Sequence, residues 1–86
     1  LSGLHGDKSA RAAKTLADEF GVRAVGVASD ASKRDAVEAL ADRAFAEFGR
    51  VDILVSNAGV GMRGLVHEIS DNDWDWLMGV NVRGTY

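Results

Sequence analysis

Three small residues that follow an aliphatic run have the types and position that suit ligand binding. The run occupies residues 51–55, and Asn57, Ala58 and Gly59 come directly after it. We expect the run to be a buried strand that stops at a polar, glycine-containing turn. Because such a turn has little side-chain bulk, its backbone can approach a ligand closely.

A second candidate is the amide of Asn81, which lies in an otherwise apolar helical pattern. Helical spacing places Trp74, Met78 and Asn81 on one face, so the amide is expected where a core hydrophobe would lie. A buried amide without hydrogen-bond partners costs roughly 1 to 3 kcal/mol. We therefore expect Asn81 to be paired, either as a structural core residue or as part of a reactive site.

A third candidate is Asp30, which follows the valine-rich residues 22–28. In an open parallel sheet, ligands lie outside the carboxyl ends of the strands, and an aspartate there can accept a hydrogen bond from one. Aspartate at a strand end also commonly stabilises turns, here beside Ser32. The sequence leaves both roles open.

Three predicted helices flank the segments that carry these candidate residues. The apolar spacing of residues 7–20 predicts an amphipathic helix that ends at Gly21. A similar stripe from Val37 to Phe48 predicts a second helix that ends at Gly49. A third long helix is expected from about residue 71. Ser32 with Asp35, and Ser70 with Asp73, have the spacing of capping pairs at the beginnings of the second and third helices.

The order of elements predicts an α/β fold. Residues 22–28 and 51–55 are expected to be strands, residues 56–64 a loop, and residues 2–4 only the tail of an earlier strand. Helices alternate with strands without a hairpin signal, which indicates parallel strands joined by right-handed crossovers. No repeat or proline linker suggests a second domain.

Composition narrows the classes of function. The net charge of −3, with ten basic residues scattered among thirteen acidic ones, argues against a nucleic-acid surface. No apolar run approaches the roughly 20 residues that span a bilayer, so we expect no membrane role. The absence of cysteine fits the cytoplasm, and His5 and His67 lack partners at metal-ligand spacing, so no metal site is expected.

Neither end of the sequence carries the signals that usually begin a protein or end a helix. The sequence does not begin with methionine, and residues 81–86 continue a helical pattern with no stop signal beyond it. We therefore expect a fragment at both ends.

The combined motifs resemble the short-chain dehydrogenase/reductase family, whose members bind NAD or NADP on a Rossmann-type sheet. The resemblance rests on Asp30 after a strand, on Gly49 to Gly59 with its Asp52, and on Val80 to Gly84 at a fitting distance. It covers nearly all of the chain. Ser56 replaces the asparagine that commonly opens the motif, which affects a structural hydrogen bond more than cofactor binding.

The resemblance implies a role for each candidate residue. Asp30 would accept a hydrogen bond from the adenine amino group, and Ala31 would contribute only backbone. The backbone of residues 57–59 would lie along a cofactor ribose, while the Asn57 side chain ties neighbouring strands together. Asn81 would support a water in a proton relay that leads through a lysine to a catalytic tyrosine. A plain strand-to-loop turn remains the alternative for residues 57–59.

The resemblance also implies which parts of the site this chain lacks. The Gly-rich pyrophosphate turn would precede residue 1, and the tyrosine and lysine would follow residue 86; Tyr86 is not that tyrosine, because it directly follows the Asn81 motif. In the Rossmann strand order 3-2-1-4-5-6, residues 22–28 and 51–55 would be the third and fourth strands. Two absent strands would separate them, so we expect unpaired edges and exposed apolar helix faces.

The sequence thus predicts a partial Rossmann-type domain, the central part of one NAD(P)-binding domain over residues 1–86. Its function would be hydride transfer between nicotinamide and an alcohol or ketone, in a parent that is a homo-oligomer. Alternatives are a non-catalytic nucleotide-binding sensor or scaffold of the same fold and, ranked last, a flavodoxin-like or response-regulator fold. Gly3, Leu4 and His5 supply neither the acid that favours NAD nor the arginine that favours NADP.

Overall fold

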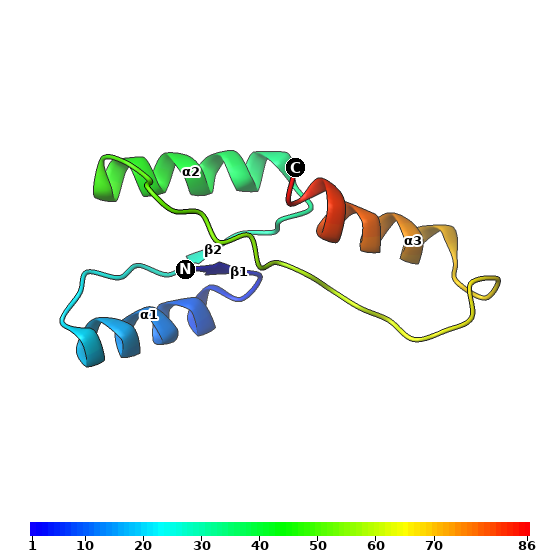
Figure 1. Cartoon of the computed structure of the whole chain (residues 1–86), viewed down its shortest axis with the longest axis horizontal. Helices are drawn as coiled ribbons and strands as arrows, with labels where there is room; N and C mark the ends of the chain where they lie inside the picture. The colour runs from blue at the N-terminus through cyan, green and yellow to red at the C-terminus, as the bar shows by residue number, and fades with distance from the viewer.

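The computed structural model describes all of residues 1–86. Its elements are, in chain order, β1 (Ser2–Gly3), α1 (Gly6–Phe20), β2 (Val27–Ala28), α2 (Arg34–Phe48), α3 (Asp71–Met78) and the π-helix η1 (Gly79–Arg83). Helix α1 lies on one side of the strand pair, and α2 and α3 lie on the other (Figure 1). No helix of the structure combines the length and the apolar composition needed to cross a membrane.

The sheet is a single parallel pair. Ser2 of β1 pairs with Val27 of β2, and Gly3 pairs with Ala28. Residues 2–4 therefore begin with a true strand rather than only a strand tail, while the strand predicted at residues 22–28 is reduced to its last two residues. The second strand is short because strand hydrogen bonds form only between backbones that lie side by side. β1 contains only two residues, so only two residues of the predicted strand can pair with it.

Residues 51–55, predicted as a strand, join no ladder. They belong to a drawn-out segment that runs between α2 and α3 (Figure 1). Ile53 and Leu54 are each 82% exposed, although their aliphatic character is typical of a buried strand. The prediction that these residues would not pair with residues 22–28 is confirmed, because no neighbouring strand lies beside them.

The helix ends follow local rules. Gly21 and Gly49 adopt left-handed backbone conformations, with φ of 63° and 78°, and end α1 and α2 as predicted. The cap of α3 is also as predicted, since the Asp73 N–H donates to Ser70 Oγ at 3.1 Å. The predicted cap of α2 is wrong: Lys33 is its N-cap residue, and Ser32 bonds to Asp30 instead.

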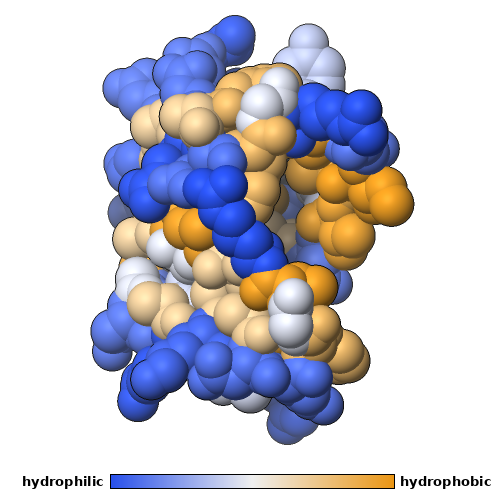
Figure 2. All heavy atoms as spheres, turned by 90° about the vertical axis from the view of Figure 1, so that its left-hand side faces the viewer, coloured by the Kyte–Doolittle hydropathy of each residue, from blue (hydrophilic) through white to orange (hydrophobic).

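Little of the chain is buried. Only Ser9, Ala13 and Val80 are buried, while the other residues are half-buried or exposed. The contact between β2 and α1 is nevertheless close, because a Cβ built on Gly26 would lie 2.3 Å from the carbonyl carbon and oxygen of Ser9. At the end of the molecule where α1 and α2 finish, apolar side chains form a band between two hydrophilic margins (Figure 2).

The third helix differs from its predicted form. It begins at Asp71 as expected, but continues beyond Met78 as a π-helix. Trp74, placed in the core by its spacing, is 54% exposed, and Asn81 is exposed as well. The expectation of a buried Asn81 is therefore wrong for this chain, because no sheet lies beneath most of this helical face.

Candidate functional site

The carboxylate of Asp30 is held in a tight turn just after β2. Its Oδ1 accepts the Ser32 backbone N–H at 2.9 Å and the Ser32 hydroxyl at 2.6 Å. No group of the chain bonds to Oδ2. The turn role that the sequence left open for Asp30 is therefore real, and it leaves one carboxylate oxygen available to a ligand.

These contacts also set the charge of Asp30. The hydroxyl of Ser32, followed by its backbone N–H, holds the pKa of the Asp30 carboxyl below its ordinary value of 3.8. Partial desolvation opposes this lowering, and the nearby charge of Lys33 adds to it. Asp30 is thus an ionised acceptor at neutral pH.

The amide of Asn81 pairs with the peptide group of Val60 at both ends. Its Oδ1 accepts the Val60 N–H at 2.8 Å, and its Nδ2 donates to the Val60 carbonyl oxygen at 2.9 Å. A Cβ built on Gly59 would lie 3.5 Å from Asn81 Oδ1, so the two residues are in ordinary contact distance. This pair joins η1 to the segment that contains residues 57–60.

The candidate residues Asn57, Ala58 and Gly59 are all exposed and lie in irregular backbone. The side chain of Asn57 makes no hydrogen bond in this chain, so its expected tie between strands stays a prediction. What holds the segment is the two-point contact at Val60, one residue beyond Gly59. The sequence carries no signal for this partner, because Val60 contributes only its peptide group.

The Asp30 turn also packs against η1. A Cβ built on Gly84, directly after η1, would lie 2.8 Å from the Ala31 carbonyl oxygen, and a Cβ on Gly79 would lie 3.7 Å from Ser32 Cβ. The missing side chain at Gly84 therefore allows η1 to approach the turn, whereas position 79 is in ordinary contact with Ser32. Through η1, the structure links the Asp30–Ala31 turn to Asn81, and Asn81 to residues 57–60.

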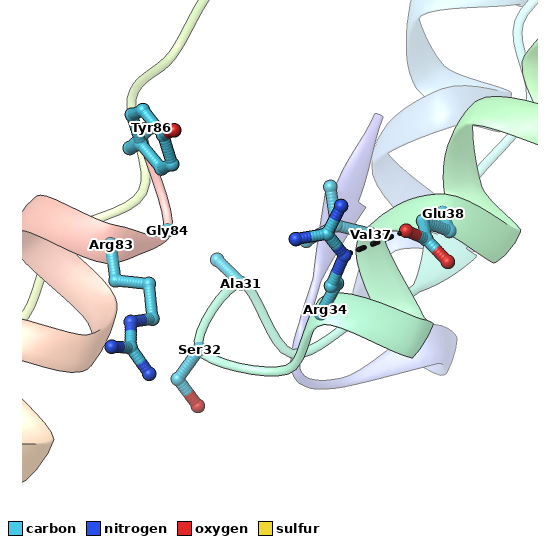
Figure 3. A pocket seen from close by; sticks show the side chains of 8 residues that line it. All are labelled: Ala31, Ser32, Arg34, Val37, Glu38, Arg83, Gly84 and Tyr86. Atoms are coloured by element: carbon cyan, nitrogen blue, oxygen red, sulfur yellow. Dashed lines mark hydrogen bonds and ion pairs between the residues drawn. The ribbon is translucent and has the colours of Figure 1, made fainter.

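A groove of about 640 Å³ opens beside this junction. Figure 3 shows Ala31 and Ser32 between two groups of side chains, with Arg83 and Tyr86 on one side and Arg34 on the other. Arg34 is engaged by Glu38, with its Nε 2.9 Å from a carboxylate oxygen. Asn57, Gly59 and Asn81 do not line this groove, so it borders the candidate site without containing it.

Comparison with known proteins decides the family. Residues 2–86 match the family described as short chain dehydrogenase. The chain belongs to this family. The resemblance drawn from Asp30, residues 49–59 and residues 80–84 is confirmed.

Curated relatives of this short-chain dehydrogenase chain include nodulation protein G of Rhizobium sp. (strain N33), 42% identical over 86 residues that are all of this chain and 35% of that protein. D-threitol dehydrogenase of Mycolicibacterium smegmatis is 41% identical over 83 residues, 93% of this chain and 32% of that protein. The chain thus spans about a third of the length of the curated relatives it matches.

Solved structures show the same relationship. A short-chain dehydrogenase/reductase from Burkholderia phymatum in complex with NAD is 44% identical, with a TM-score of 0.90 over 98% of this chain and 30% of that one. L-sorbose reductase from Gluconobacter frateurii, complexed with NADPH and L-sorbose, is 33% identical, with a TM-score of 0.90 over 98% of this chain and 32% of that one. The predicted partial Rossmann-type fold is therefore confirmed.

Proposed function

We propose that residues 1–86 are the central part of one NAD(P)-binding domain, in an oxidoreductase that transfers hydride between nicotinamide and an alcohol or ketone. The observation that carries this proposal is the joining of the Asp30 turn, residues 57–60 and Asn81 through η1. Family membership supports the reaction type, and relatives named as dehydrogenases or reductases support small alcohols, ketones or sugars as substrates.

The residues present fit parts of such a cofactor. Asp30 Oδ2 has no partner and can accept from the adenine amino group, beside the backbone of Ala31. The exposed backbone of residues 57–59, which includes Ala58 and a glycine, leaves volume for a ribose. Neighbours complexed with NAD, NADP or NADPH support a cofactor of this class without separating the two forms.

Each residue of the chain would do a defined part of the work. Asp30 and Ala31 would orient the cofactor, residues 57–59 would lie along its ribose, and Asn81 would support a water in the proton relay. When bound, the nicotinamide ring donates or accepts the hydride. The tyrosine and lysine that complete acid–base catalysis would come from outside residues 1–86, so the 86-residue chain alone would be inactive. We place the parent enzyme in the cytoplasm as a homo-oligomer with no nucleic-acid, membrane or metal partner.

The test uses the full-length protein that contains this chain. Its purified form should oxidise or reduce NAD(P)(H) with a panel of alcohols and ketones, followed by nicotinamide absorbance. Asn81→Ala should lower kcat by about 100-fold, the order expected when a general acid–base relay fails, with the KM of the cofactor nearly unchanged. Asn72→Ala, which changes an exposed amide in the first turn of α3, is the matched control and should retain activity.

Two outcomes would contradict the proposal. If the wild-type protein binds neither NAD nor NADP, the cofactor assignment fails. If it binds one of them but turns over no alcohol or ketone, the protein is a non-catalytic nucleotide-binding member of the fold. Melting temperatures of the variants would show whether a loss of activity reflects loss of the proton relay or unfolding of the protein.

A further inference from the structure

The two donors of Ser32 converge on a single oxygen of Asp30. Its backbone N–H and its hydroxyl both bond to Oδ1, at 2.9 and 2.6 Å, while Oδ2 bonds to nothing in the chain. A carboxylate with one oxygen held twice has little freedom to rotate about its side-chain bonds. The free oxygen is therefore presented in one direction.

The turn that carries this carboxylate is supported from the opposite side. Gly84 faces the Ala31 carbonyl so closely that a Cβ there would lie 2.8 Å away, and Gly79 faces Ser32. Backbone contact of this kind leaves the turn little room to shift toward η1. The position of Asp30 is thus set by Ser32 within the turn and by η1 beneath it.

We propose that Ser32 is a positioning residue that aims Asp30 Oδ2 at the exocyclic amino group of a purine, so that the protein distinguishes adenine from hypoxanthine in a dinucleotide. The inference rests on the proposed function, because it assumes that an adenine-containing cofactor binds at Asp30. An ionised carboxylate only accepts hydrogen bonds. It pairs with the amino group of adenine and is repelled by the carbonyl oxygen that hypoxanthine carries in its place.

The test measures dissociation constants for two cofactors in the full-length protein. One is NAD, or NADP if that form binds; the other is its hypoxanthine analogue, which differs only at the purine. The wild-type protein should bind the adenine form at least about tenfold more tightly, as expected for a hydrogen bond to a charged group. Ser32→Ala should reduce this ratio to below about threefold by weakening only the adenine form, and Ser32→Thr, which keeps a hydroxyl, should restore it.

Ser70→Ala is the matched control. Ser70 also donates its hydroxyl to a nearby aspartate, with Oγ 2.8 Å from Asp73 Oδ2, but it does so at the beginning of α3. Its loss should leave the ratio unchanged, because its role is confined to the helix cap. Asp30→Asn provides a second variant, and it should abolish the preference for adenine even if Ser32→Ala fails to fold.

The outcomes separate this inference from the proposed function. A wild-type protein that binds neither dinucleotide overturns both. If the wild-type protein binds NAD or NADP but Ser32→Ala keeps the full ratio, or weakens both forms equally, the positioning role is overturned and cofactor binding stands. An unchanged ratio in Asp30→Asn likewise overturns the assignment of the purine to Asp30.

Discussion

Asp30 and Asn81 use their polar atoms in different ways. Asn81 engages both its oxygen and its nitrogen with one peptide group, that of Val60. Asp30 instead receives two donors on one oxygen and keeps the other free. The amide therefore serves first to hold two segments together, whereas the carboxylate retains an open acceptor. This difference suits Asp30 for direct contact with a ligand and Asn81 for holding the site's backbone in place.

Ser32→Ala should raise the pKa of Asp30, because the hydroxyl donor is the largest cause of its lowering. In the wild-type protein the folded-state pKa of Asp30 lies below its ordinary value of 3.8, which the unfolded chain would show. The resulting stabilisation is present above that pH and is lost as the pH falls through the lowered folded-state pKa. An NMR titration of the Asp30 carboxyl carbon in the full-length protein would measure the pKa of Asp30 in the variant and in the wild type. Equal midpoints in the variant and the wild type would refute the assigned cause.

Asn81→Ala should speed hydrogen exchange at the Val60 amide. The Val60 N–H has Asn81 Oδ1 as its partner at 2.8 Å, and removing the acceptor leaves this donor to water. Exchange at Gly49, whose N–H bonds to the Phe45 carbonyl at 2.8 Å, serves as the internal control and should not change. Mass-spectrometric or NMR exchange in the full-length protein would record both sites. Unaltered protection at Val60 would show that Asn81 does not hold this segment.

At the scale of elements, the contact between β2 and α1 depends on a missing side chain. The residue before β2, Gly26, lies so close to Ser9 that any Cβ would overlap helix backbone. Helix backbone cannot move aside as the end of a flexible side chain can. The strand pair and α1 therefore pack only if position 26 remains glycine.

Gly26→Ala should destabilise the full-length protein by about 1 to 3 kcal/mol, the range for overpacking a fitted contact. The matched control is Gly61→Ala, where nothing lies within 4 Å of an added Cβ and φ is not positive. That change should stay within about 0.5 kcal/mol. Urea denaturation followed by circular dichroism gives both values. If the two variants proved equally stable, the close contact at Gly26 would be wrong.

At the scale of the molecule, the chain exposes far more surface than its size requires. Its accessible surface is 7018 Å², whereas a compact monomer of this mass exposes about 4,900 Å². Its radius of gyration is 15.2 Å, against about 12 Å for a compact chain of this length. The difference, roughly 2,100 Å², exceeds the roughly 800 Å² that each partner buries in a standard protein interface. This supports the proposal that residues 1–86 are the central part of a larger domain.

The isolated 86-residue chain should therefore lack a cooperative thermal transition as a monomer. With Ser9, Ala13 and Val80 as its only buried residues, it gains too little from burial to offset the entropy of folding. We expect weak, sloping unfolding, binding of a hydrophobic dye, or self-association through exposed apolar residues. Calorimetry would show whether the chain has a cooperative thermal transition, and analytical ultracentrifugation would show whether it is monomeric. A sharp transition in a monomeric sample would overturn this prediction.

Much of the fold and the site could be predicted from local pattern. The helices and their stops at Gly21 and Gly49 follow from periodicity and from the conformational freedom of glycine, which act within a few residues. The turn role of Asp30 was likewise visible as one of two alternatives. The contact with Val60 was not, because a peptide group has no identity in sequence. The role of Ser32 was misassigned, because Asp30 and the helix compete for the same hydroxyl.

By itself, the sequence determined the helices and the α/β order, because these depend on spacing along the chain. Its motifs gave a resemblance to the family, which the match over residues 2–86 then showed. Only the tertiary structure decided which backbone segments pair through hydrogen bonds with another segment. Residues 2–3 became a strand because residues 27–28 lie beside them, and residues 51–55 did not because nothing does. Strand pairing and the Asn81–Val60 contact both require segments that are distant in sequence to meet in space. Whether two such segments meet depends on the rest of the chain that folds around them, so no local sequence pattern predicts these contacts.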